Sequence, residues 1–486
     1  MSTLGAILRF GVHVPRLRLP RALIAESMAW LQPPGRARTD GFRAIANWDE
    51  DAITLAVEAA RSCLGGTDGA PEGAKPESLY LCSTSAPFAD RDEALMVAAA
   101  LDLPEDVQTL NLGSSLRAGT GGLISAAQRA SAPTLVVASE ARLARPGSAQ
   151  ELAYGDGAAA CLVGPPSGDA LASIVAVRSI GSDFVDHYRM AGRSFDYSLE
   201  ERWIRDESLM ILVPRLIREL LAGAGCEGGA VRHLALPATA SAAKRIADSA
   251  GLGAAKRDDT VLAGCGDAGA ALPLLLMAAA TEAASPGDLI LAVGIGQGVD
   301  AVLLRAERAV RNAPPVLSNA LRQRREESSY LRYLSHRGLL DVDFGMRAER
   351  DHRTAHSVAY RKREALSAFK GGRCESCGTV QFPRSRVCVN PECRALDRQV
   401  PYGLASSHGR VKTFTEDWQA YCPRPPYVYG NVEFAEGGNL FMEFTDIEPG
   451  ELEVNDPIRF VYRIKDDDRM RGFRRYFWKA TKVSAP

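Results

Sequence analysis

The stretch CESCGTVQFPRSRVCVNPEC, residues 374–393, holds four cysteines in two short-spaced pairs. Cys374 and Cys377 form the first pair, and after ten further residues Cys388 and Cys393 form the second. Two such thiolate pairs on neighbouring turns can close a tetrahedral site around zinc that leaves no open position. Four free thiols in a loop would instead expose reactive sulfur. We therefore predict a structural, non-catalytic zinc bound by all four cysteines.

Downstream of this cluster, short β-like stretches alternate with Gly, Pro or Asp. They are GRVKTFTEDW, YVYGNVEFA, NLFMEFTDI, PIRFVYRI and RRYFWKATKV. Five short strands with turn signals between them are typical of a small β-barrel. We predict a zinc ribbon over residues 371–402 and a barrel over residues 403–486.

Upstream of the ribbon, the composition changes near residue 306. The chain before it is rich in Ala and Gly, whereas RNAPPVLSNALRQRREESS after it is polar and broken by proline. Such a segment is typical of a linker. Residues 330–370 are strongly charged and partly helical in pattern. We predict a front domain over residues 1–306 and a linker with a helical segment over residues 307–370.

The front domain contains an internal repeat. Gly113–Glu140 and Gly266–Gly294 each read as a Gly-rich loop, an Ala-rich helix, a small turn and an apolar strand. Helices that are apolar on all sides lie buried within a domain, and continuous apolar strands belong to sheets covered on both faces. We predict a five-layered α-β-α-β-α sandwich with two repeated halves, about 1–170 and 171–306. Two unrelated βα units remain the alternative.

Bulk properties narrow the class of protein. At 486 residues the chain can form two or three domains, and its formal net charge of −1 favours neither nucleic acid nor an anionic membrane as partner. No apolar run is long enough to span a bilayer, and basic residues interrupt the first twenty positions where a signal peptide would be apolar. We expect a cytoplasmic protein, where clustered cysteines bind metal rather than form disulfides.

The C-terminal part resembles the DUF35 family, whose modules combine a rubredoxin-like zinc ribbon with an OB-fold. The resemblance covers residues 330 to 486 and rests on the cysteine stretch together with VKTFTEDW, PPYVYGNVEF, GGNLFMEFTD and GFRRYFWKA. It implies that the barrel is an OB-fold. It also implies that the module holds an acyl-CoA substrate and supports a thiolase subunit.

The front domain resembles 3-hydroxy-3-methylglutaryl-CoA synthases and the related ketoacyl synthase III enzymes of the thiolase superfamily. The similar segments are LYLCSTSAPFAD (79–90), SSLRAGTGG (114–122), YGDGAAACLVG (154–164), DAGAALPLL (267–275) and SPGDLILAVGIGQG (285–298). They occur in the family's order along nearly the whole domain. The resemblance implies a thiolase-like fold, a coenzyme A thioester as substrate, and a homodimer formed through edge strands.

The family's catalytic residues are replaced in this chain. The nucleophilic cysteine of the family falls on Leu116, and the glutamate that serves as general acid/base falls on Thr84. The family's asparagine falls on Asp267 or its neighbour, and Pro237 stands near the histidine position, with His233 earlier. An acyl-cysteine cannot form at Leu116. Cys82 and Cys265 remain as alternative thiols, although buried cysteines are usually inert fillers.

Other parts of the pattern survive. Residues 294–298, GIGQG, match the loop whose backbone N–H groups help to form an oxyanion hole in the family. The residues expected to bind the CoA thioester are Ser115, Arg117, Gly296 and Gln297. The residues expected to serve as acid or base are Asp186, His187, Tyr188 and Asp267, although the string SDFVDHYRM is also typical of a solvated loop or a core network.

These observations leave three hypotheses open. The favoured one is an acyl-CoA enzyme that makes or breaks a carbon–carbon bond without an acyl-enzyme, by retro-aldol cleavage of a β-hydroxyacyl-CoA. The second is a non-catalytic subunit that presents acyl-CoA to a separate thiolase. The third, a nucleic-acid-binding OB protein, lacks support because the basic residues near Lys465–Arg475 are offset by Asp466–Asp468. The sequence identifies neither the acyl group nor the direction of the reaction.

Overall fold

The computed structural model describes residues 4–31, 39–65, 75–253, 255–309, 315–349, 353 and 355–483. A nine-stranded sheet in the order β11-β12-β13-β8-β1-β7-β6-β4-β5 forms the frame of the front domain. Its strands are β1 (Ala6–His13), β4 (Ser78–Cys82), β5 (Gln108–Leu112), β6 (Thr134–Glu140), β7 (Gly157–Gly164), β8 (Ala172–Gly181), β11 (Val231–Ala235), β12 (Leu289–Gly296) and β13 (Gly298–Ala306).

The pairing of these strands follows one plan twice. In the first set β4 runs parallel to β6, and antiparallel pairs then join β6 to β7 and β7 to β1. In the second set β11 runs parallel to β12, and antiparallel pairs join β12 to β13 and β13 to β8. A short contact at Ala6 and Ile7 of β1 joins the two sets. The same order and directions therefore recur in both halves of the sheet.

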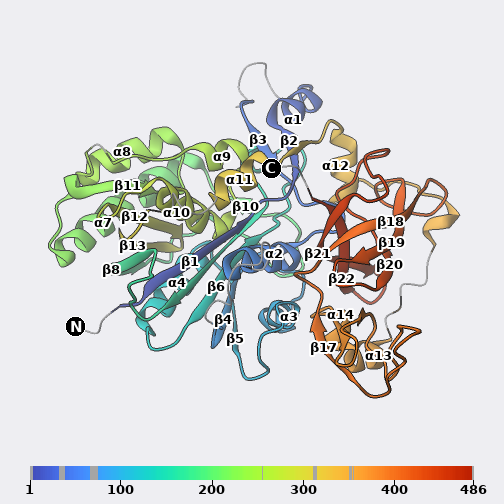
Figure 1. Ribbon diagram of the computed structural model, residues 1–486. Helices are drawn as coiled ribbons and strands as arrows, with labels where there is room; N and C mark the ends of the chain where they lie inside the picture. Colours follow the sequence, from blue (N-terminus) through green and yellow to red (C-terminus); the bar gives the residue numbers. More distant parts are fainter. Residues whose placement is uncertain are drawn as a thin grey trace.

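Helices cover and separate the two halves of this sheet (Figure 1). The long ones are α2 (Ala52–Leu64), α3 (Glu93–Ala100), α4 (Ala118–Gln128), α7 (Met210–Ala224), α8 (Ala240–Ala250) and α10 (Leu272–Ala283). Strand β4 shows why the layers form: Leu79 and Leu81 pack with α2 and α3, whereas Tyr80 and Cys82 face the core that holds α4 and α10. Helices α7 and α8 pack on the remaining face. The predicted five-layered thiolase-like fold is confirmed.

Shorter elements connect this frame. They are β2 (Leu17–Pro20), α1 (Arg21–Ser27), β3 (Phe42–Ala44), α5 (Ala149–Ala153), β9 (His187–Tyr188), β10 (Tyr197–Ser198), α6 (Glu201–Trp203), η1 (Ile204–Leu209), η2 (Gly228–Ala230), α9 (Thr260–Gly264) and η3 (Gly269–Ala271). Across the described ranges, no helix is both long and apolar enough to cross a membrane.

The first part of the expected linker is packed against the front domain. It contains α11 (Val316–Arg322), β14 (Arg325–Glu326) and α12 (Tyr330–His336), and β14 pairs with β2. The Tyr330 hydroxyl donates to the Glu151 carboxylate at 2.9 Å, and Arg337 forms an ion pair of 3.1 Å with the buried Asp156. This part of residues 307–370 thus behaves as a portion of the front domain rather than as a free spacer.

The C-terminal module has two sheets. The ribbon sheet and the helices before it comprise η5 (Met346–Ala348), α13 (His356–Arg361), α14 (Arg363–Leu366), β15 (Lys370–Cys374), β16 (Val380–Gln381) and β17 (Gln399–Gly403). The barrel comprises β18 (His408–Asp417), β19 (Tyr427–Phe434), β20 (Asn439–Glu443), β21 (Pro457–Asp468) and β22 (Phe473–Lys482). Its order is β20-β19-β18-β21-β22, and the Thr445 N–H donates to the Ala480 carbonyl at 2.9 Å, which nearly closes the sheet.

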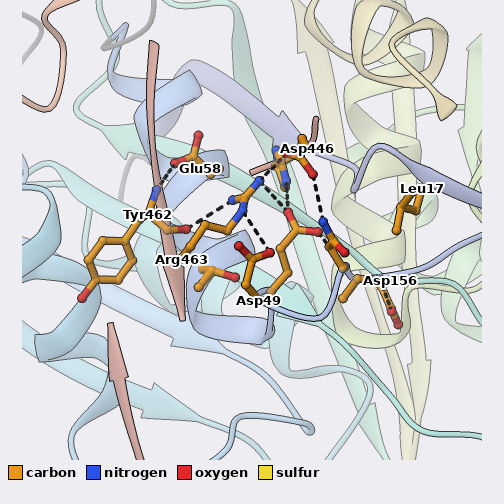
Figure 2. A network of polar contacts seen from close by, with 12 residues as sticks. Leu17, Asp49, Glu58, Asp156, Asp446, Tyr462 and Arg463 are labelled. Carbon is orange, nitrogen blue, oxygen red and sulfur yellow. Dashed lines mark hydrogen bonds and ion pairs between the residues drawn. The ribbon is translucent and has the colours of Figure 1, made fainter. Parts of the chain in front are cut away.

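A buried network of charges joins the barrel to the segment that leads into α2 (Figure 2). The guanidinium of Arg463 lies 3.0 Å from carboxylate oxygens of both Glu50 and Asp446, and Lys479 lies 2.9 Å from Asp49. No side chain among them is more than 7% exposed. Taking a charge out of water is costly unless partners surround it, so this arrangement holds the two domains in one position.

Candidate functional site

The cysteine cluster has the geometry of a zinc site. All four Sγ atoms lie within 4.8 Å of one another, with 3.9 Å between Cys374 and Cys393 and 3.5 Å between Cys377 and Cys388. A tetrahedral site with Zn–S bonds of about 2.3 Å requires S···S separations of roughly 3.8 Å. The four sulfurs therefore fit zinc and leave no position for a substrate, as the spacing of the cysteines predicts.

The candidate site in the front domain lies where three parallel strands end. Strand β4 pairs with β5 on one side and β6 on the other, so that Cys82 is in register with Leu112 and Ala138. Two residues farther on, Thr84 and Ser114 follow the ends of β4 and β5, and Glu140 is the last residue of β6. The carboxyl ends of parallel strands in open α/β sheets are where ligands bind.

The start of α4 takes the position of the family's nucleophile, and it carries a leucine. Leu116 is half-buried just before the helix. A Cβ atom at Gly296 would lie 2.6 Å from the Ser115 hydroxyl and 3.0 Å from Cγ of Arg117, so only glycine lets the end of β12 approach so closely. Arg117 donates to Asp300 at 2.7 Å. The structure thus brings together Ser115, Arg117 and Gly296.

His187 lies beside this loop. The Gln297 side-chain amide is 3.5 Å from the His187 carbonyl oxygen, and Nδ1 of His187 is 3.0 Å from the Asp186 carboxylate. Burial alone would lower the pKa of His187, but the hydrogen bond that its ring N–H donates to the Asp186 carboxylate raises it. Tyr188 points elsewhere: it is half exposed and its ring packs on Tyr197, 5.4 Å between centroids.

A buried arginine that the sequence did not single out holds the polar groups of the site together. Arg142 Nη2 lies 3.2 Å from the Asp267 carboxylate, and Arg142 stacks on the Tyr154 ring at 3.8 Å. Tyr154 donates to Asp196 at 2.7 Å. The charges of Arg142 and Asp196 also act on the pKa of His187. Asp267 and His187 are therefore members of one electrostatic cluster around Arg142.

Glu140 is the second residue that the sequence reasoning missed. Its carboxylate is buried, accepts from the Thr84 N–H at 2.8 Å and the Thr84 hydroxyl at 2.9 Å, and accepts a short hydrogen bond from the Ser85 hydroxyl. Burial raises the pKa of Glu140. An acidic residue directly after an apolar strand was the signal available in LVVASE. The position that lacks the family's glutamate is thus contacted by a carboxylate from the neighbouring strand.

A cleft of about 1730 Å³ between the front domain and the barrel opens on Thr84 and Ser85. Its basic lining residues are Arg189, Arg193, Arg337, Lys465, Arg469 and Arg474. Ser115, Gly296 and Gln297 are not among the described residues that line it. The cleft therefore reaches the site from the side of β4 and Glu140 rather than from the start of α4.

The two candidate thiols are poor nucleophiles. Cys82 and Cys265 are fully buried, and burial raises the pKa of each thiol to about 12. The Cys265 Sγ lies 3.4 Å from the Asp156 carbonyl. Because the thiolate is the reactive form, neither sulfur is suited to attack a thioester.

Comparison with known families confirms the C-terminal module. Residues 363–397 match the family described as ChsH2, rubredoxin-like zinc ribbon domain. Residues 404–463 match the family described as ChsH2, C-terminal OB-fold domain. The zinc ribbon and the OB-fold predicted from the sequence are both borne out.

The front domain has relatives of known name. The hydroxymethylglutaryl-CoA synthase of Aeropyrum pernix is 27% identical over 347 residues, which cover 68% of this chain and 94% of the relative. The corresponding enzyme of Archaeoglobus fulgidus is 28% identical, over 68% of this chain and 98% of the relative. Two independent whole-length relatives of one name support the resemblance that the motifs indicate.

Solved structures agree on the fold. PksG, an HMG-CoA synthase from Bacillus subtilis, superposes with a TM-score of 0.57 at 18% identity, covering 72% of this chain and 95% of that one. MvaS in complex with 3-hydroxy-3-methylglutaryl coenzyme A gives a TM-score of 0.55 at 20% identity, covering 70% and 93%. The class is therefore a thiolase-like α/β protein with an appended zinc ribbon and OB-fold. In particular, the front domain is similar in sequence to hydroxymethylglutaryl-CoA synthases, and residues 363–397 and 404–463 match the two ChsH2 domain families.

Proposed function

We propose that this protein acts on acyl-CoA thioesters and cleaves a carbon–carbon bond of a β-hydroxyacyl-CoA by a retro-aldol reaction, without an acyl-enzyme. The observation that carries the proposal is that Leu116 stands where the resemblance places the nucleophile, while other polar groups surround that position. A leucine replaces the nucleophile, yet the Gly296 loop, the His187–Asp186 pair and the cluster around Arg142 still gather at the same strand ends.

The groups that a retro-aldol reaction needs are present at this site, and the reaction does not need the thiol that the site lacks. It requires a base for the β-hydroxyl proton and donors that stabilise the enolate oxygen, but no thiol. The backbone N–H groups near Gly296 and Gln297, with Ser115, are suited to the thioester oxygen. His187, backed by Asp186, and Asp267, held by Arg142, are suited to proton transfer. Arg117 is paired with Asp300 and would order the loop.

The cleft between the front domain and the barrel is our candidate for the CoA moiety. Coenzyme A carries phosphate groups, which arginine binds in a bidentate manner and lysine binds as a point charge. Arg189 and Arg193 of the front domain line this cleft, and so do Lys465 and Arg469 of the barrel, beside Asp466, Asp467 and Asp468. A nucleotide in this cleft would contact both domains, which gives the permanent attachment of the barrel a role in substrate binding.

The experiment that tests this proposal is turnover by the zinc-loaded full chain. A panel of β-hydroxyacyl-CoAs, including 3-hydroxy-3-methylglutaryl-CoA, is incubated with the chain alone, and both the shortened acyl-CoA and the released carbonyl compound are quantified. Stoichiometric appearance of the two products is the expected result. If the chain alone is inactive but stimulates a co-purified thiolase, the non-catalytic subunit replaces the enzyme as the better account.

We also propose a homodimer formed through the free edge of the sheet. Strand β5 ends the nine-stranded order, and its Leu110 side chain is 39% exposed. An open edge strand presents unpaired N–H and C=O groups that a second copy can pair with. Light scattering at micromolar concentration should give twice the chain mass of 52.2 kDa.

A further inference from the structure

The carboxylate of Glu140 lies behind two hydroxyl groups that face the cleft. Thr84 and Ser85 line the cleft, whereas Glu140 is fully buried beneath them. The Thr84 hydroxyl donates to Glu140 at 2.9 Å, and the Ser85 hydroxyl donates to the second oxygen of the same carboxylate. One buried acid therefore binds the protons of both hydroxyls.

This arrangement determines what the hydroxyls offer to a ligand. A hydroxyl has one proton and two lone pairs. The Ser85 oxygen also accepts from the Ala141 N–H at 2.8 Å, so its proton and one lone pair are used and one lone pair is left. The Thr84 hydroxyl donates its proton in a hydrogen bond to Glu140, and its oxygen keeps both lone pairs. While Glu140 is ionised, both hydroxyls can therefore only accept hydrogen bonds from a ligand in the cleft.

The backbone around the pair is fixed. The Thr84 N–H donates to Glu140 at 2.8 Å, and the guanidinium of Arg189 donates to the Thr84 carbonyl. Thr84 follows β4 and Glu140 ends β6, and these neighbouring parallel strands are in register. The charge of Arg142, two residues beyond Glu140, lowers the pKa of Glu140, and the buried thiol of Cys82 is a titratable neighbour whose pKa Glu140 raises. The geometry is therefore set by the sheet.

We infer that Glu140 is the terminal proton acceptor of this site and that the hydroxyls of Thr84 and Ser85 relay the proton to it from the substrate. The inference rests on the proposed function, and it names Glu140 rather than His187 or Asp267 as the group that takes the β-hydroxyl proton in that reaction. The resemblance places a glutamate at position 84, where this chain has a threonine. In this chain the carboxylate belongs instead to Glu140, which lies beneath Thr84 and is reached through a hydroxyl.

The proton and electrons balance as follows. The β-hydroxyl of the substrate gives its proton to a relay hydroxyl, which passes its own proton to Glu140. The hydroxyl oxygen becomes a carbonyl oxygen as the Cα–Cβ bond breaks. The electron pair of the broken bond forms the enolate of the shortened acyl-CoA. The proton held by Glu140 returns through the relay to the α-carbon, so that Glu140 is ionised again. With 3-hydroxy-3-methylglutaryl-CoA the products are acetoacetate and acetyl-CoA.

The experiment compares wild type with Glu140→Gln and with the double variant Thr84→Val/Ser85→Ala. Two reactions are followed: cleavage of 3-hydroxy-3-methylglutaryl-CoA, and exchange of the α-protons of acetyl-CoA in heavy water. We expect both variants to slow cleavage and exchange by about 10²–10⁴-fold. Burial raises the pKa of Glu140, so kcat/KM of wild type should rise with pH at values above the ordinary pKa of a glutamate. Glu140→Gln should lose that limb of the profile.

The matched control is Glu151→Gln. Glu151 is also a buried carboxylate that accepts one N–H and one hydroxyl, from Gly147 and Tyr330, and it does not line the cleft. Its variant should keep full activity. The relay variant Thr84→Val/Ser85→Ala retains Glu140 and keeps the test valid if Glu140→Gln fails to fold.

The outcomes separate the two claims. If wild type cleaves the substrate and both test variants are as active as Glu151→Gln, with an unchanged pH profile, the relay is wrong and the proposed function stands. If wild type shows exchange without cleavage, and Glu140→Gln abolishes the exchange, the retro-aldol reaction falls while Glu140 stays the proton acceptor. If wild type shows neither cleavage nor exchange, both claims fall.

Discussion

The molecule contains two networks of buried charged side chains, and they differ in how far their members are exposed to water. At the domain interface, Arg463 and Lys479 lie among Asp49, Glu50 and Asp446, and no side chain of this set is more than 7% exposed, although Glu50 lines the cleft. In the front-domain site, the Arg142 cluster ends at the surface. One member, Asp267, has a side chain that is 36% exposed, and Thr84 and Ser85 open on the cleft.

The difference teaches what each network can do. A closed network of charges fixes a geometry, because any shift would leave a buried charge without its partner. An open network can exchange protons with a ligand, because some of its groups face solvent. Both are built from arginines and carboxylates at the ends of strands or beside them. Only the access to water separates a structural role from a chemical one.

The largest effect is expected at the zinc site, which lies outside both networks. Cys377→Ser should lose the metal and unfold the ribbon, since structural zinc binding contributes about 10–16 kcal/mol of folding free energy in small zinc modules. Metal analysis should find one zinc per wild-type chain, and hydrogen exchange should show loss of protection in residues 371–402. Less than about half an equivalent of zinc in well-folded wild type would contradict the prediction.

Breaking the closed network should cost stability. Arg463→Met removes the cation between Glu50 and Asp446 and should lower the free energy of unfolding by about 3–5 kcal/mol, because carboxylates remain buried without a partner. Denaturant titration measures this. Arg386→Met is the matched control: its pair with Asp397 is exposed, and solvent screens such pairs so that they contribute little to stability. Equal effects of the two variants would refute the distinction.

Altering the open network should instead cost turnover. His187→Ala and Asp267→Ala should each lower kcat by about 10²–10⁴-fold, and His187→Ala should leave the free energy of unfolding close to that of wild type. Turnover of the substrate found in the acyl-CoA panel and a parallel denaturation curve supply the two readouts. Full activity in both variants would show that neither residue transfers a proton.

The pH dependence of stability should have opposite sign for two carboxylates beside the barrel, Glu58 and Asp446, and for Glu140 of the open network. Although burial acts to raise them, nearby guanidiniums hold the pKa values of Glu58 and Asp446 at about 2. At pH values above the ordinary carboxyl pKa, each carboxylate then contributes about 2–3 kcal/mol to the free energy of unfolding. This contribution is lost as the pH falls toward 2. Burial raises the pKa of Glu140, so its ionisation destabilises the fold as the pH rises.

Unfolding measured from pH 7 to pH 3 checks these signs. Glu58→Gln should flatten the loss of stability in acid, because the folded state no longer holds a carboxylate beside Arg61. Glu140→Gln should make the protein more stable than wild type at pH 7, since it removes a buried charge. A Glu140→Gln variant that is less stable at pH 7 than at pH 4 relative to wild type would reverse the assignment.

The sequence predicted those features that depend on residues close together in the chain. The zinc ligands lie within twenty residues, and the repeated halves follow from apolar helices and strands that each read locally. The loss of the nucleophile was visible at Leu116 because a motif surrounds it. Glu140 and Arg142 escaped notice because their roles arise from register: parallel strands β4 and β6 bring Thr84 and Glu140 together across 56 positions. Likewise, the packing of residues 316–339 depends on Glu151 and Asp156, far earlier in the chain.

The smallest effect is expected at the cysteines of the front domain, where the prediction is no change. Cys82 and Cys265 are buried with thiol pKa values of about 12, so iodoacetamide at pH 7.5 should modify neither, and incubation with acyl-CoA should leave no thioester on the protein. Leu116→Cys supplies the contrast, because a thiol at the start of α4 gains from the helix dipole and should be alkylated readily. Mass spectrometry of digests from both proteins reports each site. An acyl adduct on Cys82 or Cys265 would show that the nucleophile has moved rather than vanished. The open network would then serve a Claisen reaction through an acyl-enzyme, and the retro-aldol proposal would have to be given up.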